Sequence, residues 1–370
     1  MDKVKLTDIC RPKQWKTIST AQLKESGYSV YGANGKIGFY NEYTHEFPTL
    51  LITCRGATCG TVNISEPKSY VNGNAMALDN LSKDYDLKFL YHYFGQRGFN
   101  DVISGSAQPQ ITRENLSKVE VPKINLATQQ RIATILDQAD ALIQNNRAIV
   151  QKYDALTQSL FLDMFGDPVK NEKGWEMKYL GDLCDVGSSR RVFVDELVEI
   201  GIPFYRGTEI GQMSLEDNIT PTLFITEEHY EKLKKETGVP KIGDLLMPSI
   251  CPDGRIFEVT NDKPFYFKDG RVLWIKVNNE IINSVYLKKH LKAIFAIDYG
   301  KIASGTTFAE LKIFALKKIN LHYPPLNLQN QFAERVAVIE AQKQQAQLAL
   351  AKSETLFQSL LQRAFKGELN

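Results

Sequence analysis

Apolar side chains recur every three or four residues along two long stretches of the chain, the first of which covers residues 128–165. Eight of the ten positions in its predicted seam are apolar or aromatic: Ile132, Ile135, Ala139, Leu142, Asn146, Ile149, Tyr153, Leu156, Leu160 and Asp163. Neither proline nor glycine interrupts the stretch. The pattern predicts a long α-helix that packs in a coiled coil. At about 1.5 Å per residue the helix would be about 55 Å long, too long for the interior of an ordinary domain.

The second stretch, residues 335–365, repeats the pattern with a weaker seam. Polar Lys343 and Ser353 interrupt a series that otherwise contains Val336, Ile339, Ala346, Leu350, Phe357, Leu360 and Ala364. We expect the two helices to pair antiparallel and to leave a face for another protein. The residues assigned to the coiled coil and to partner docking are Ile132, Ile135, Leu142, Ile149, Leu156, Leu160, Val336, Ile339, Leu350, Phe357 and Leu360. The alternative is two ordinary amphipathic helices in separate cores.

A repeat of about half the chain organises the rest of the sequence. Each half has a strand-rich region before its long helix, and Asn34-Gly35 between apolar runs indicates a hairpin in the first half. Similar segments occur in the same order in both halves and indicate a duplication. They are residues 5–10 and 179–184, 104–111 and 304–311, 116–122 and 316–321, and 156–160 and 356–360.

The repeat divides the chain into four predicted segments, which are a globular domain (1–125), a central helix (126–168), a second globular domain (169–327) and a C-terminal helix (328–370). The predicted fold class is therefore α+β. Two mixed α/β domains are separated by two long antiparallel coiled-coil helices and related by a pseudo-two-fold repeat. This arrangement would suit a target with two separated half-sites.

Composition excludes several other classes of protein. The net charge is +2 and the isoelectric point about 8.1, which neither requires nor excludes nucleic acid. No apolar run approaches the roughly 20 residues of a membrane span, and the polar start predicts no signal peptide. We therefore expect a cytoplasmic protein that does not bind membranes. The scattered cysteines are interpreted as reduced, buried thiols: Cys10, Cys54, Cys59, Cys184 and Cys251.

The sequence lacks the motifs of common enzymes. It has no Gly-x-Gly-x-x-Gly and no phosphate loop, and 323–326 (Tyr-Pro-Pro-Leu) lacks the leading Asn or Asp of adenine methyltransferases. Its five histidines show no paired metal-ligand spacing. We expect a binding protein without catalytic residues, metal or cofactor. The alternative enzyme reading is a nuclease, which would need to combine Pro252-Asp253 with Glu310 and Lys312, far apart in the sequence.

Residue types that contact nucleic acid occur in predicted turns of both halves. The turn at 105–110 offers a glycine, a hydroxyl and two glutamines, and glutamine can bond adenine at two positions. Its counterpart at 305–307 keeps the hydroxyls but not the glutamines, and a structural turn is the alternative for both. Each cation has the alternative of a solvated surface charge. The candidates for DNA binding are Lys36, Arg55, Arg97, Gly105, Ser106, Gln108, Gln110, Arg113, Arg190, Arg191, Arg206, Arg255, Lys268, Arg271, Thr306 and Thr307.

These features resemble the specificity subunit of a type I restriction-modification system over essentially the whole chain. The resemblance rests on the repeat, the Gly-Ser-x-Gln-x-Gln-Ile turn at 105–111, Val-x-Val-Pro at 119–122 and Ala-Leu-Thr-Gln-Ser-Leu at 155–160. The second half departs from it at 308–310 (Phe-Ala-Glu). The resemblance implies a non-catalytic subunit whose two target-recognition domains each read half of a bipartite site in double-stranded DNA.

The same resemblance implies that the helices set the spacer between half-sites and dock two methyltransferase subunits. Two motor-nuclease subunits would complete the complex, so adenine methylation and ATP-dependent cleavage would belong to partners. One alternative is a structural tether with two protein-binding domains that does not bind DNA. Another is a specificity subunit that serves a methyltransferase-only defence system.

Overall fold

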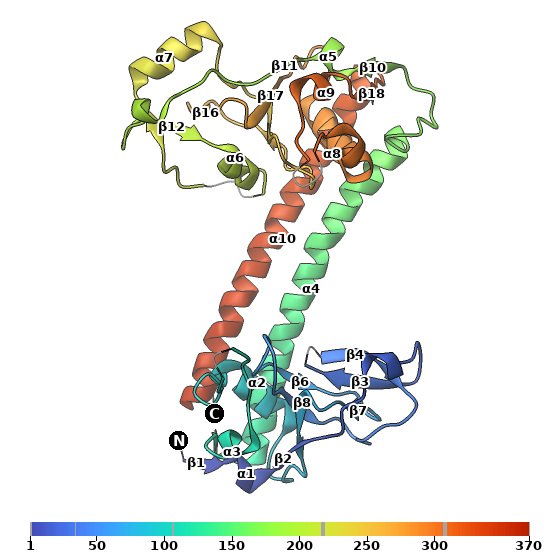
Figure 1. The fold of residues 1–370 in the computed structure, drawn as a ribbon, viewed down its shortest axis with the longest axis vertical. Coiled ribbons are helices and arrows are strands. Elements are labelled where there is room, and N and C mark those ends of the chain that lie inside the picture. The colour runs from blue at the N-terminus through green and yellow to red at the C-terminus, as the bar shows by residue number, and fades with distance from the viewer. Residues whose placement is uncertain (1, 34, 106, 216–218, 306–308, 370) are drawn as a thin grey trace. The chain divides into compact units, whose positions relative to one another are not determined.

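The computed structural model describes residues 2–33, 35–105, 107–215, 219–305 and 309–369 (Figure 1). The chain forms two compact units, and each contains one end of both long helices. Unit 1 comprises Met1–Ile149 with Ala346–Asn370, and unit 2 comprises Val150–Gln345. The two long helices are α4 (Leu126–Phe165) and α10 (Leu326–Lys366). These unit boundaries lie inside α4 and α10, whereas the sequence predicted boundaries at 125, 168 and 327, at the ends of the helices. The two divisions describe different things, so the four predicted segments stay a prediction.

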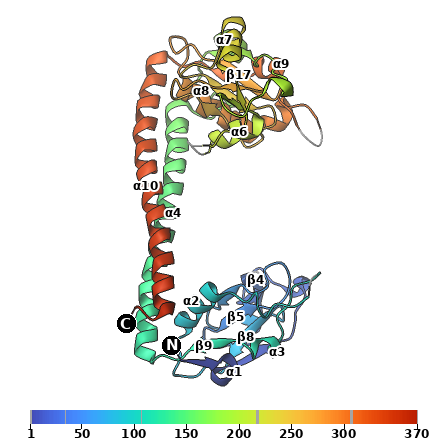
Figure 2. The same cartoon turned by 90° about the vertical axis from the view of Figure 1, so that its left-hand side faces the viewer.

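Unit 1 contains three small sheets, with strand orders β2-β8-β5-β6, β4-β3-β7 and β1-β9. All pairs are antiparallel except β3 with β7. Helix α2 packs on the four-stranded sheet, as Figure 2 shows. The elements are β1 (Lys3–Lys5), α1 (Leu6–Ile9), β2 (Arg11–Gln14), the 3-10 helix η1 (Thr20–Gln22), β3 (Tyr28–Gly32), β4 (Gly35–Tyr40), β5 (Leu50–Thr53), β6 (Val62–Ile64), β7 (Tyr70–Val71), β8 (Ala75–Asp79), α2 (Leu87–Arg97), α3 (Arg113–Leu116) and β9 (Glu120–Pro122).

Unit 2 has the same three sheets, with strand orders β11-β17-β14-β15, β13-β12-β16 and β10-β18. Its additional helices, α6 and α7, lie in the sequence between β12 and β14, where unit 1 has only β4 among its described elements. The elements are β10 (Met177–Tyr179), α5 (Leu180–Leu183), β11 (Asp185–Gly187), η2 (Val194–Glu196), β12 (Ile202–Tyr205), α6 (Gly207–Met213), β13 (Phe224–Ile225), α7 (Glu227–Glu236), β14 (Leu245–Pro248), β15 (Phe257–Glu258), β16 (Tyr266–Phe267), β17 (Val272–Lys276), α8 (Ser284–Ile302), α9 (Ile313–Lys317) and β18 (Asn320–His322).

The matching strand orders confirm the duplication predicted from the sequence, and one buried glutamine occupies the same place in both units. Gln129, at the start of α4, accepts a hydrogen bond from the backbone N–H of Asp86 (2.9 Å) and donates one to the carbonyl of Ile124 (2.8 Å). Gln329, at the start of α10, accepts a bond from the N–H of Asn283 at 2.9 Å. Each glutamine thereby attaches its long helix to the N-cap residue of another helix of the same unit, α2 in unit 1 and α8 in unit 2.

The long helices run antiparallel within each unit. In unit 1, the hydrophobic core joins Ile132 near the start of α4 to Leu361 near the end of α10. In unit 2, Phe161 near the end of α4 packs edge-to-face against Phe332 near the start of α10, at 5.8 Å between ring centroids. The end of each long helix therefore completes a core to which the start of the other contributes.

In α10 the predicted seam is confirmed, because its residues are buried or half-buried. In α4 one of the two series of predicted seam residues is wrong, because Leu142, Ile149 and Leu156 are exposed. Leu142 is 44% exposed, whereas its neighbour Ile143 is 4% exposed. Ile149 and Leu156 are likewise exposed, one residue before the positions that turn inward. Because apolar residues are adjacent at 142–143 and at 149–150, periodicity alone could not decide which of the two faces α10. The exposed residues form a separate apolar stripe, and their docking role stays a prediction.

Candidate nucleic-acid interface

Three loops of unit 1 lie side by side and contain most of the predicted contacts of the first half. The hydroxyl of Thr53 donates a hydrogen bond to the carbonyl of Ala33 (2.6 Å), which connects the β3–β4 turn to the loop after β5. The N–H of Gly56 donates to the carbonyl of Pro109 (3.1 Å), which connects that loop to the turn at 104–110. Hydrogen bonds across the loops therefore hold residues that are more than 70 positions apart in one surface.

The turn at 104–110 depends on glycine. Gly105 has φ +86°, and a Cβ there would lie 2.6 Å from the carbonyl oxygen of Gln108. Gln110 closes the turn by bridging to Ser104 and also pairs with Arg55, so Arg55, Gln108 and Gln110 are brought together and exposed. The predicted Ser106 lies outside the described residues, as does Asn34 of the β3–β4 turn.

The other cations predicted in the first half are more scattered. Lys36 lies in β4 beside the first loop, with its Nζ 3.2 Å from a carboxylate oxygen of Glu66. Arg97, at the end of α2, forms a two-pronged pair with Asp101 (2.7 and 3.1 Å) and is mostly sheltered. Arg113 is exposed on the first residue of α3. Arg97 is therefore the poorest candidate of this group for a DNA contact.

In unit 2, four of the six predicted cations lie around α6. The parallel strands β12 and β16 end side by side, where the N–H of Lys268 donates to the carbonyl of Tyr205, just before Arg206. Arg271 lies three residues after Lys268, and a Cβ added at Gly207 would lie 3.0 Å from the carbonyl oxygen of Arg271. The guanidinium of Arg255 lies 3.0 Å from the Cβ position of Gly211.

The remaining two arginines of this group are adjacent in the loop after β11. Arg191 reaches Asp269, between Lys268 and Arg271, with Nε 3.1 Å from Oδ2. Arg190 pairs instead with Glu236 at the end of α7, at 3.1 Å. The predicted Thr306 and Thr307, and Phe308 after them, lie outside the described residues.

In three of these ion pairs the cation is exposed and the carboxylate is sheltered beneath it. The side chain of Arg191 is 68% exposed and that of Asp269 20%. For Arg271 and Glu310, 3.9 Å apart, the values are 65% and 23%. Such pairs position the guanidinium groups and leave the outer surface positive, which suits phosphate contacts.

The third pair, Arg206 with Glu209, also begins α6. The carboxylate of Glu209 accepts bonds from the Arg206 side chain (2.5 and 3.0 Å) and from its backbone N–H (3.1 Å). Burial raises the pKa of Glu209, but the bonds from Arg206 outweigh that effect and hold the pKa below its usual value. Glu209 is therefore ionised at neutral pH and fixes the cation above it.

The structure also exposes two polar side chains of α6 that the sequence interpretation missed, Thr208 and Gln212. The only available signal was a glutamate three residues into the helix, which is typical of a helix start. The usual Ser or Thr at the preceding cap is Arg206 here, and two glycines further weaken the local helix pattern.

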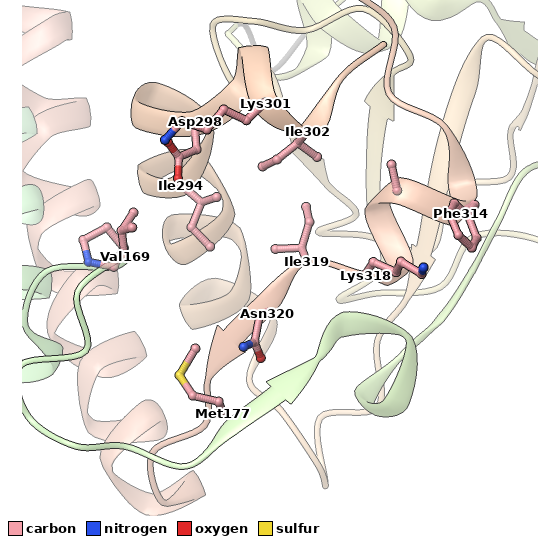
Figure 3. A pocket seen from close by; sticks show the side chains of 12 residues that line it. Val169, Met177, Ile294, Asp298, Lys301, Ile302, Phe314, Lys318, Ile319 and Asn320 are labelled. Atoms are coloured by element: carbon pink, nitrogen blue, oxygen red, sulfur yellow. The ribbon is translucent and has the colours of Figure 1, made fainter.

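A pocket of about 480 Å³ lies elsewhere in unit 2, between α8, α9 and the chain that follows α4 (Figure 3). Its walls are mostly apolar and include Met177, Ile294 and Phe314, and the paired Asp298 and Lys301 line it on the α8 side. None of the predicted DNA contacts lines this pocket.

The described residues offer little for covalent or metal chemistry. Burial, reinforced by nearby carboxylates, raises the pKa of the thiols of Cys10, Cys184 and Cys251 to about 12, so they are protonated at neutral pH. No three His, Cys, Asp or Glu side chains in the described ranges are grouped to hold a metal ion. No helix of the described part of the chain is long and apolar enough to cross a membrane.

The family model for the type I restriction modification DNA specificity domain matches residues 1–152 and 172–349. The chain belongs to this family. It is 26% identical to the specificity subunit S.HindORF215P of Haemophilus influenzae over 322 residues, which cover 84% of this chain and 80% of that protein. It is also 26% identical to the MjaIX specificity subunit of Methanocaldococcus jannaschii over 328 residues, with 80% and 73% covered.

The fold is shared with solved specificity subunits. The crystal structure of the type I S subunit from M. genitalium aligns with a TM-score of 0.64 and 17% identity, over 98% of this chain and 95% of that one. A structure from work on complex assembly and conformational transition of the type I R-M system aligns with a TM-score of 0.52 and 15% identity, over 99% and 98%. The predicted family, fold class and general function are therefore confirmed. The chain is a DNA specificity subunit, the non-catalytic component of a type I system.

Proposed function

We propose that this specificity subunit binds a bipartite site in double-stranded DNA, with each unit reading one half. The observation that carries the proposal is the group of exposed cations at α6 and the loop after β16 in unit 2, three of them held over sheltered carboxylates. In unit 1, the adjoining loops with Arg55, Gln108 and Gln110 present a cation and two amides. The two units share one strand order, so each can present such loops from the same kind of scaffold.

The long helices supply the rest of the proposed complex. Leu142, Ile149 and Leu156 form an apolar stripe on α4 that does not face α10, and the spacing of seven residues keeps them on one side. An exposed apolar stripe of this kind indicates a protein partner. We propose that it docks methyltransferase subunits, two per complex, and that two motor-nuclease subunits complete the assembly. The site of action would be the cytoplasm of a bacterial or archaeal cell, where the DNA is.

The test is co-expression of the chain with a methyltransferase subunit of its system, followed by base-resolution mapping of adenine methylation in the host DNA. We expect a split motif, methylated on both strands, that disappears when this chain is omitted. A soluble complex that methylates nothing and shows no salt-dependent affinity for DNA would favour the structural tether, because phosphate contacts make DNA binding salt-dependent. Whether the system is methyltransferase-only is a separate question, which a neighbouring gene for a motor-nuclease subunit would decide.

The proposed spacer function of the helices has its own test. Inserting four residues at matching places in α4 and α10 lengthens each helix by about 6 Å. That distance equals one to two base pairs, at roughly 3.4 Å per pair along one strand. We expect the unspecified bases between the half-sites to increase by that number while both half-sites stay the same. An unchanged spacer in a folded, active variant would contradict this function of the helices.

A further inference from the structure

Helix α6 presents one short row of side chains to solvent. Thr208 and Gln212 are four residues apart, and Leu215, two residues beyond the end of the helix, follows after three more, so all three lie on one side. The N–H of Leu215 donates to the carbonyl of Gln212 (2.8 Å), which continues the helical turn. The opposite side is buried, with Ile210 inaccessible to solvent. The exposed row therefore combines a hydroxyl, an amide and an apolar group.

The helix is held rigidly against the sheet of its unit. It packs beside β12, as Figure 1 shows, and the Cβ position of Gly211 lies 3.3 Å from the ring of Pro248 in β14. A Cβ at Gly207 would lie 3.0 Å from the carbonyl oxygen of Arg271, and one at Gly211 3.0 Å from the guanidinium of Arg255, so both glycines sit in tight contact with their neighbours. This packing fixes the orientation of Thr208, Gln212 and Leu215, so no movement of the unit is needed to present them.

The surroundings of α6 match what DNA requires of a base-reading element. Arg206, Lys268 and Arg271 lie around its first turn, and Arg255 lies beside its middle. Cations around a central row of polar side chains can hold phosphates on both sides of a groove. The major groove is about 12 Å wide and admits an α-helix.

Unit 1 has no described helix at the corresponding place, between β3 and β5, and its glutamines lie in the turn at 104–110 instead. The corresponding turn of unit 2 has Ser304 and Glu310 where unit 1 has Ser104 and Gln110. In unit 2 an acceptor carboxylate thus replaces an amide in the turn, while an amide appears on α6. The two units therefore carry their amides on different elements.

We infer that α6 enters the major groove of the second half-site and that Gln212 and Thr208 read bases there. The inference rests on the proposed function, since it requires that unit 2 bind DNA. The carboxamide of Gln212 would bond the N6 and N7 positions of an adenine, and Thr208 would contact the neighbouring base by its hydroxyl or methyl group. The surrounding arginines and Lys268 would hold phosphates.

The experiment compares methylation motifs produced by the full chain with its methyltransferase subunit, using Gln212→Ala, Gln212→Glu and Thr208→Val. Gln331→Ala, an exposed glutamine at the start of α10, is the matched control. We expect Gln212→Ala to reduce discrimination at one base pair of the second half-site by roughly 5- to 150-fold. Gln212→Glu should shift the preference there from adenine towards cytosine, because a carboxylate accepts a bond from cytosine N4. The first half-site should stay the same.

The outcomes separate this inference from the proposed function. A bipartite motif that is unchanged in all three variants would overturn the role of α6 and leave the proposed function standing. A uniform loss of methylation at all sites, with the motif unchanged, would assign Gln212 to phosphate and also overturn base reading. If the unmodified complex shows neither a bipartite motif nor salt-dependent DNA binding, the proposed function fails and the inference fails with it.

Discussion

Two neighbouring residues of α4 allow a direct test of how the long helices pair. Ile143 is 4% exposed and Leu142 is 44% exposed. Replacing a buried isoleucine by alanine removes apolar contacts and leaves a cavity, which costs about 2–5 kcal/mol. Replacing a half-exposed leucine loses only part of its burial, about 1 kcal/mol or less. Both changes raise helix propensity slightly, so the difference between them reports packing.

The measurement is urea unfolding of the full chain, followed by helical circular dichroism and by hydrogen exchange of the segment 136–150. Hydrogen exchange is needed because a chain with two units has no single free energy of unfolding. We expect Ile143→Ala to shift the transition of this segment to clearly lower urea and Leu142→Ala to leave it nearly unchanged. If Leu142→Ala destabilises the segment as much as Ile143→Ala, the observed register is wrong. In the folded Leu142→Ala variant, weaker retention of the methyltransferase subunit would support docking on the exposed stripe.

Three further predictions concern buried hydrogen bonds, protonation and phosphate contacts. Gln129→Ala leaves three backbone groups without hydrogen-bond partners, so the free energy of unfolding of unit 1 should fall by about 3 kcal/mol or more. In the same calorimetric scan, replacing the exposed neighbour, Gln130→Ala, should cost less than about 0.5 kcal/mol. Burial, with a smaller effect of a neighbouring histidine, lowers the pKa of His290 from 6.5 to about 3. As the pH falls, the imidazole is therefore protonated in the unfolded chain before it is protonated in the folded chain. Unit 2 should therefore lose stability progressively from pH 6.5 towards 3, by up to about 1.4 kcal/mol per pH unit from this group, and His290→Phe should reduce that slope in unfolding measured at several pH values. Arg191→Ala should weaken DNA binding similarly for all sequences and reduce the slope of log affinity against log salt by about 1, and an unchanged slope would exclude a phosphate contact.

The sequence was most informative where physical signals are periodic or repeated. The two long helices and the duplicated order of elements follow from apolar spacing and from matched segments, and the structure contains both. The register of α4 could not be derived, because Leu142 and Ile143 are adjacent and both apolar. Only the packing of α10 against α4 decides which of the two is buried, and in the structure it is Ile143.

The candidate interface shows a different limit of sequence reasoning. The cations of unit 2 were individually identifiable, but Arg191 and Asp269 are 78 positions apart. They meet because β11, before Arg191, pairs with β17, which follows Asp269. Helix α6 was missed because it has seven residues, two glycines and an arginine at its cap. Short helices of this kind are formed by tertiary packing, here on β14, and by the Arg206–Glu209 bonds.

The duplication also has a consequence for how the chain can be divided. The sequence repeat runs from a globular region into its own long helix, but each compact unit needs the end of the other helix. In unit 1, Phe365 of α10 packs against Phe89 and Tyr93 of α2, at 5.7 and 5.3 Å between ring centroids. In unit 2, Phe165 of α4 packs against Tyr286 of α8 at 4.6 Å. A fragment cut at the sequence repeat would therefore expose part of its core, and a domain exchange that preserves folding must keep residues 346–370 compatible with α2.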